Sequence, residues 1–132
     1  MKVKTSKGGY YFIISLEVYP FDVMISFNET DKVLLERLVG YGNSKEDCAD
    51  LMNLPCTTLA RFSMLPSNQS IIRIKKQENK YVLIGVISHE IFHAATFILA
   101  RIGMAMEIGS SDEAYAYLVQ YLTEQVCREL KL

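Results

Sequence analysis

The segment that most constrains this chain is an apolar stretch of 26 residues, Tyr81–Met106. A helix of that length could cross a bilayer or form the centre of a globular core. Four ionisable residues interrupt it, namely His89, Glu90, His93 and Arg101. In a lone membrane span each charge costs about 2.5 to 3.5 kcal/mol, and no second apolar segment could shelter these groups. We therefore expect a core helix and no membrane span.

The composition is that of one small globular domain, which we expect to cover residues 1–132. Half of the 132 residues are hydrophobic, and 14 Lys and Arg stand against 15 Asp and Glu. The only basic cluster is Arg73, Lys75 and Lys76, so an electrostatic footprint for DNA or RNA is missing. We expect no nucleic-acid partner, and the composition does not predict an oligomeric state.

The cysteines and the N-terminal segment bear on the compartment. Three cysteines with no CxxC pair leave at least one free thiol, which suits a reducing compartment. The apolar segment Tyr10–Val18 is interrupted by Ser15 and Glu17, so it does not resemble the core of an export signal. We expect a cytoplasmic protein.

Periodicity along the chain predicts an α+β fold. Alternating apolar residues predict strands, and spacings of three and four predict helices. The expected strands are Tyr11–Val18, Phe21–Asn28, Thr57–Met64 and Ser70–Lys76, and the expected helices are Asp31–Val39, Tyr81–Ile102 and one from Ser110 or Ser111 to about Leu130. We expect a small, mostly antiparallel sheet of about four strands with the helices packed on one side.

One predicted strand has an uneven pattern. In Ser70–Lys76 the apolar Ile72 and Ile74 alternate with Arg73 and Lys75, which is typical of a strand with one solvated face at a sheet edge. An extended peptide could pair with such an edge, and the two basic residues would favour acidic side chains.

Both histidines of the chain lie in one pentapeptide, His89–His93 with the sequence HEIFH, which is the HExxH pattern. On a helix, positions i and i+4 share a face, so both imidazoles can converge on one ion, and Glu90 can reach its open side. Two imidazoles and an oxygen ligand suit Zn²⁺, which lowers the pKa of a bound water towards about 7. We predict that His89 and His93 are zinc ligands and that Glu90 is the general base for that water. The alternative is two hydrogen-bonded histidines on a buried helix.

A zinc site of this kind needs a third protein ligand, and because no histidine is left, a carboxylate or a cysteine must supply it. Glu113 is our first choice, since a reversal at Gly103–Gly109 would return the last helix towards the histidines. However, Ser110–Glu113 also matches a capping box, in which Glu113 bonds the Ser110 backbone N–H. If Ser111 is the cap, Glu113 is free. The reserve candidates are Asp112 and Glu107.

Tyr117 and Gln120 share a helical face with Glu113, at i+4 and i+7. A phenol or an amide there could hydrogen-bond a ligand or stabilise an oxyanion. The alternative, which we favour, is that Tyr115, Tyr117 and Tyr121 form an aromatic stripe in the core.

Two runs of sequence carry a resemblance to a known family. The run HEIFHA at His89–Ala94 and the run DEAYAYL at Asp112–Leu118 resemble the gluzincin zinc peptidases, to which thermolysin belongs. The chain is most similar to small metallopeptidases encoded by phages and prophages, and the resemblance covers Ile87–Leu122.

The resemblance implies a minimal zincin-like fold with His89, His93 and Glu113 as zinc ligands and Glu90 as the general base. One position departs from the pattern. Tyr117 stands where thermolysin-like enzymes have an aspartate that orients a histidine ligand.

Two functions are therefore expected from the sequence. The first is a zinc-dependent metallopeptidase that hydrolyses a peptide or protein substrate with a zinc-bound water activated by Glu90. The alternative is a non-catalytic binding or regulatory module of a phage or mobile element with a structural or vestigial zinc site. A fourth protein ligand, such as Cys127, would support the alternative, because structural zinc has no open position.

Overall fold

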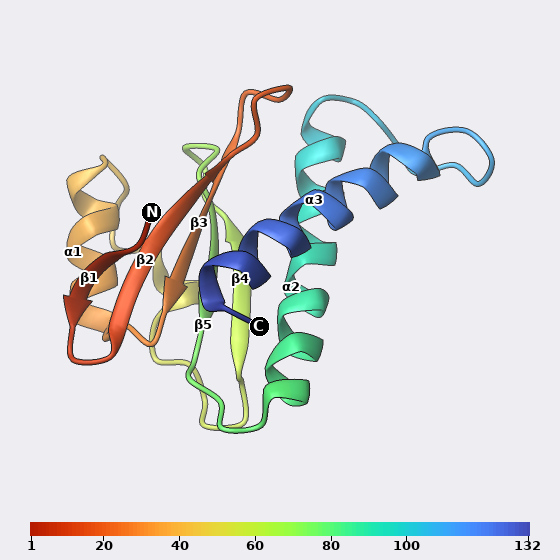
Figure 1. The fold of residues 1–132 in the computed structure, drawn as a ribbon. Helices are drawn as coiled ribbons and strands as arrows, with labels where there is room; N and C mark the ends of the chain where they lie inside the picture. The colour runs from red at the N-terminus through yellow and green to blue at the C-terminus, as the bar shows by residue number, and fades with distance from the viewer.

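The computed structural model describes residues 1–132 as an α+β fold built on one mixed sheet (Figure 1). The strands are β1 (Val3–Ser6), β2 (Gly9–Ser15), β3 (Asp22–Phe27), β4 (Ala60–Met64) and β5 (Ser70–Ile74). The helices are α1 (Asp31–Gly40), α2 (Lys80–Arg101) and α3 (Asp112–Leu130), with one 3-10 turn, η1 (Ala49–Leu51). The predicted α+β class is confirmed, and β1 is the strand that the sequence analysis missed.

The sheet has the strand order β1-β2-β3-β5-β4. Neighbouring strands are antiparallel except for β3 and β5, which are parallel. The predicted hairpin of β4 and β5 is confirmed. The prediction that its second arm is the edge is wrong, because β5 lies between β3 and β4 and is buried along its whole length.

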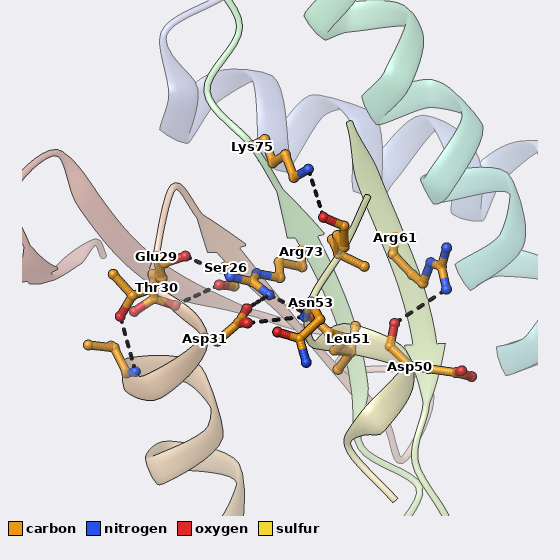
Figure 2. Close-up of polar contacts among 12 residues, drawn as sticks. Ser26, Glu29, Thr30, Asp31, Asp50, Leu51, Asn53, Arg61, Arg73 and Lys75 are labelled. Carbon is orange, nitrogen blue, oxygen red and sulfur yellow. Dashed lines mark hydrogen bonds and ion pairs between the residues drawn. The ribbon is translucent and has the colours of Figure 1, made fainter. Parts of the chain in front are cut away.

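Arg73 explains why the pattern of β5 suggested a solvated face. Its guanidinium group is buried and forms an ion pair with Asp31, and it donates hydrogen bonds to the carbonyl oxygens of Leu51 (2.6 Å) and Glu29 (2.9 Å) (Figure 2). Lys75 donates to the carbonyl oxygen of Pro55 at 2.7 Å. Both basic groups are therefore bound inside the fold, and neither is free to select an acidic peptide.

Helices cover both faces of the sheet, which corrects the expectation of helices on one side. Alternate residues of β3 show this: Val23 and Ile25 belong to the core under α2 and α3, whereas Met24 belongs to a smaller core with Leu34 and Leu38 of α1. Because side chains alternate across a strand, α1 packs on the face opposite to α2 and α3.

The long apolar segment forms α2, which is capped by the Asn79 side chain at the Tyr81 and Val82 N–H groups. It is long and apolar enough to cross a membrane, and it is the one such helix in the protein. Its buried residues, all of which except Glu90 pack in the larger core against the sheet and α3, are Leu83, Ile87, Glu90, Ile91, Ala94, Ala95, Ile98 and Leu99. Burial in this core accounts for part of the apolar composition of α2, since 44% of its most apolar window is buried in the protein.

Candidate metal centre

The two histidines lie one helical turn apart on the flank of α2, beside the buried stripe. Both side chains are exposed, and their rings meet edge to face with centroids 4.9 Å apart. The Nε2 atoms of His89 and His93 are 3.2 Å apart. The HExxH segment is therefore helical, as predicted, and it aims both imidazoles at one point in solvent.

The separation of the two nitrogens fits a shared metal ion. Two ligands about 2.0 to 2.1 Å from a tetrahedral zinc ion lie roughly 3.3 Å from each other. The observed 3.2 Å between the Nε2 atoms matches that spacing. The same distance is also that of a hydrogen bond between the two rings, so it is compatible both with the predicted zinc ligands and with the alternative of two hydrogen-bonded histidines.

Glu90 lies on the other side of the pair, between α2 and the sheet. Its side chain is 8% exposed, and Oε2 accepts a hydrogen bond of 2.7 Å from the backbone N–H of Phe62 in β4. The Phe62 ring packs at 5.3 Å, between centroids, from the ring of Phe97. The carboxylate is thus held at the edge of the sheet, next to the histidines.

Two adjoining cavities run along this edge and form one groove. The first, of about 440 Å³, has His89, Glu90 and His93 in its wall, and the second, of about 410 Å³, shares His89 and Glu90 with it. The remaining wall of the first is Asp50, Ala60, Arg61, Phe62, Ser63, Met64 and Phe97, and that of the second is Thr57, Thr58, Leu59, Ala60, Val82, Gly85 and Val86. We call this feature the β4 groove. It borders the free edge of β4 and the segment just before that strand, from Thr57 to Leu59.

The structure does not bring Glu113 to the histidines. Glu113 is exposed in the first turn of α3, and neither cavity of the β4 groove includes it. In Figure 1 the N-terminal end of α3 lies to the side of α2, beyond the C-terminal part of that helix. No third His, Cys, Asp or Glu side chain joins the pair to form a group that could hold a metal ion.

The position at which α3 begins decides whether Glu113 belongs to the capping box that the sequence also matched. Ser111 is the N-cap of α3, so Glu113 occupies the second helical position and not the third position that a capping box requires. Ser111 donates its hydroxyl proton to the Ala105 carbonyl and accepts from the Glu107 N–H. Glu113 is therefore free of a capping role.

The other candidates on α3 and the preceding loop are also engaged away from the histidines. Asp112 accepts from the Gly109 N–H, and Glu107 accepts from the Ser110 hydroxyl. Cys127 is a free thiol near the end of α3, and burial raises its pKa. None of the three joins the pair.

The tyrosines of α3 have different roles. Tyr115 is buried and donates to the Met104 carbonyl, as expected of a core residue. Tyr117 is 67% exposed and lines a separate apolar cavity of about 440 Å³ with Tyr121, Val18 and Tyr19. The structure therefore places Tyr117 apart from the β4 groove.

Sequence reasoning missed the contribution of β4 to the site. The Phe62 N–H, the Phe97 ring and Asp50 all line the cavity beside the histidines. Every residue except proline has a backbone N–H, so the sequence does not show that the N–H of Phe62 is the one that binds Glu90. Which strand lies at the edge depends on pairing between distant segments. No protein family, characterised protein or solved structure was found to match this chain.

Proposed function

We propose that the protein is a zinc-dependent metallopeptidase with a minimal zincin-like fold, in which His89 and His93 hold the metal. The observation that carries this proposal is the 3.2 Å separation of their Nε2 atoms beside a buried carboxylate and a groove. When bound, a zinc ion polarises a carbonyl group and lowers the pKa of water.

Glu90 is the proton acceptor in this proposal. It follows His89 on the helix, it lines the same cavity, and it is not placed with the imidazoles as a ligand. A general base must lie within reach of the proton that it takes, and Glu90 is the carboxylate on α2 that meets this condition. In the structure without a peptide, its hydrogen bond from the Phe62 N–H keeps the carboxylate in the wall of the groove.

The substrate class follows from the free edge of β4. An extended peptide pairs with an unpaired strand edge through backbone hydrogen bonds, and alternate side chains enter the flanking pockets. In this protein that edge is β4 and not β5, and it borders the cavity that contains both histidines. Val82 and Val86 give the second cavity an apolar wall that suits apolar substrate side chains, whereas Asp50, Arg61 and Ser63 make the cavity beside the histidines more polar.

A second function is favoured by one observation. Only two metal-binding side chains converge, because Glu113 lies elsewhere in the structure. A non-catalytic module whose metal is completed by a partner protein would need no third ligand of its own. In the hydrolase proposal, Glu113 stays the predicted third ligand, and the first turn of α3 must approach the histidines when the metal binds.

Metal content and hydrolysis of labelled casein test the proposal together. We expect about one zinc per chain in the wild type, and loss of zinc and activity in His89→Ala and His93→Ala, because each imidazole is one of few ligands. The matched control is Ser88→Ala, an exposed neighbour on α2. Glu90→Gln should keep zinc and lose hydrolysis, since an amide does not accept the proton. Stoichiometric zinc in the double histidine variant would refute the site.

A further inference from the structure

The backbone of β4 alternates between groups paired with β5 and groups that face the free edge. The N–H of Lys75 bonds the Leu59 carbonyl, and the N–H of Leu65 bonds the Gln69 carbonyl, so the odd-numbered residues are those paired with β5. Ala60, Phe62 and Met64 therefore turn their N–H and C=O groups away from the sheet. An incoming strand would pair with these three residues.

The N–H of Phe62, the central donor of that edge, already forms a hydrogen bond within the protein. Glu90 reaches from α2 to the Phe62 N–H and accepts its hydrogen bond at 2.7 Å. The carboxylate oxygen thus stands where the carbonyl oxygen of an added strand would stand. A strand cannot form this bond while Glu90 holds it, because a backbone amide has one proton to donate.

We propose that Glu90 is a latch on the free edge of β4, and that an extended peptide opens it by taking the Phe62 N–H. Peptide addition and release of the Glu90 carboxylate are then one event. This inference rests on the proposed function for the use of the β4 groove as a peptide site, but it requires no metal ion.

Through the latch, Glu90 links the binding of a peptide at β4 to the proton transfer proposed for its carboxylate. Without a peptide the carboxylate is tied to the sheet, and with a peptide in the groove it is free beside the histidines. Because the peptide and Glu90 compete for the same N–H, a change that weakens the bond between Glu90 and Phe62 strengthens peptide binding by up to the same factor.

The test uses metal-free, full-length protein and a neutral probe, the end-blocked hexapeptide acetyl-(Val-Thr)3-amide. Affinity is measured for the wild type, Glu90→Ala and Glu90→Gln. The alanine removes the latch and leaves the Phe62 N–H free, whereas glutamine keeps an oxygen acceptor and removes only the charge. The peptide control carries N-methyl groups on alternate residues, which block strand pairing without changing the sequence.

We expect Glu90→Ala to bind the probe about three- to tenfold more tightly than the wild type, the range for one backbone hydrogen bond. The affinity of Glu90→Gln for the probe should lie closer to that of the wild type. The N-methylated peptide should bind none of the three proteins. Hydrogen exchange of the Phe62 amide should accelerate in Glu90→Ala alone.

Equal affinity for the wild type and Glu90→Ala, no binding to Glu90→Ala, or binding of the N-methylated peptide would each overturn the latch. Circular dichroism checks that the alanine variant folds. If it does not fold, the carboxyl carbon resonance of Glu90 in the wild type decides, since it must shift when the probe binds. Because no metal or hydrolysis is measured, failure here is distinct from failure of the zinc site.

Discussion

The helix places His89 and His93 on one face, and the rotamers of the two side chains bring their Nε2 atoms to 3.2 Å. His89 and His93 stand on a well-ordered turn of α2 whose buried side is anchored by Ile87, Ile91 and Ala94. If zinc binds as proposed, the two imidazoles lose little conformational entropy, whereas the first turn of α3 must still move for Glu113 to join them.

Glu113 is the residue at which the two proposed functions differ most. In the hydrolase proposal we expect Glu113→Gln to lower zinc affinity at least about tenfold, because a neutral amide replaces an anionic ligand. Its melting temperature without metal should stay unchanged, since Glu113 is exposed and has no capping role. Titration with zinc is the measurement, and Glu124→Gln, which changes an exposed carboxylate further along α3, is the control.

Equal zinc affinity in the wild type and Glu113→Gln would contradict the hydrolase ligand set. The third ligand would then be Asp112, Glu107 or a cysteine, or the remaining coordination positions would belong to water or to a partner protein. That result would favour the binding module, in agreement with the separation of Glu113 from the pair in the structure.

At the scale of elements, a buried ionic contact joins α1, η1 and β5 on the face opposite the candidate site (Figure 2). Burial by itself would raise the pKa of Asp31. The hydrogen bond and charge of Arg73, together with the Asn53 N–H, outweigh that effect and hold the pKa of Asp31 below its ordinary value. The ionised carboxylate is therefore the form that the fold stabilises.

This shift predicts a pH dependence of the free energy of unfolding. A lowered folded-state pKa stabilises the protein above the unfolded value of about 3.9, and the stabilisation is lost as the pH falls through the folded pKa. Asp31→Asn should cost about 0.5 to 1 kcal/mol at pH 7, a small value because the carboxylate is 41% exposed. Urea unfolding of the wild type and Asp31→Asn at pH 7 and pH 3 measures the difference in the free energy of unfolding. A variant with the same loss of stability on acidification as the wild type would refute the shift.

Gly85 lies in the interior of α2 and faces the β4 groove. A Cβ atom added there would meet no other atom within 4 Å. Gly85→Ala should therefore raise the free energy of unfolding by about 0.5 to 1 kcal/mol, through helix propensity alone. Thermal unfolding is the measurement. The same methyl group narrows the groove, so a simultaneous loss of peptide affinity is expected, and Ser88→Ala on an outer face of α2 is the control.

At the scale of the whole molecule, we expect the fold not to depend on the proposed zinc ion. The main core holds 19 buried residues from the sheet, α2 and α3, and both histidines lie outside it. We expect the far-ultraviolet circular dichroism spectrum to be unchanged after chelation. Excess zinc should raise the melting temperature by several degrees in the wild type, because a ligand at 100 times its Kd stabilises by about 2.7 kcal/mol.

The double variant His89→Ala with His93→Ala serves as the control and should show no zinc-dependent increase in melting temperature. Unfolding of the wild type by a chelator would contradict this expectation. It would indicate a structural zinc ion, as in domains that fold only with metal.

The sequence by itself determined the features that depend on neighbours along the chain. Periodicity located α1, α2, α3 and the hairpin of β4 and β5, since a helix or a tight turn is set by nearby residues. The same local geometry brought His89 and His93 together, because four residues make about one helical turn.

Only the tertiary structure decided which strand lies at the edge, which face each helix covers and which residues join the histidines. Arg73 suggested a solvated strand, but its partners Asp31 and Leu51 come from distant segments, and their pairing buries it. The contact of Glu90 with Phe62 spans 28 positions, and the parallel pairing of β3 with β5 spans more than 40. Such contacts depend on how elements pack in space, which local periodicity does not encode.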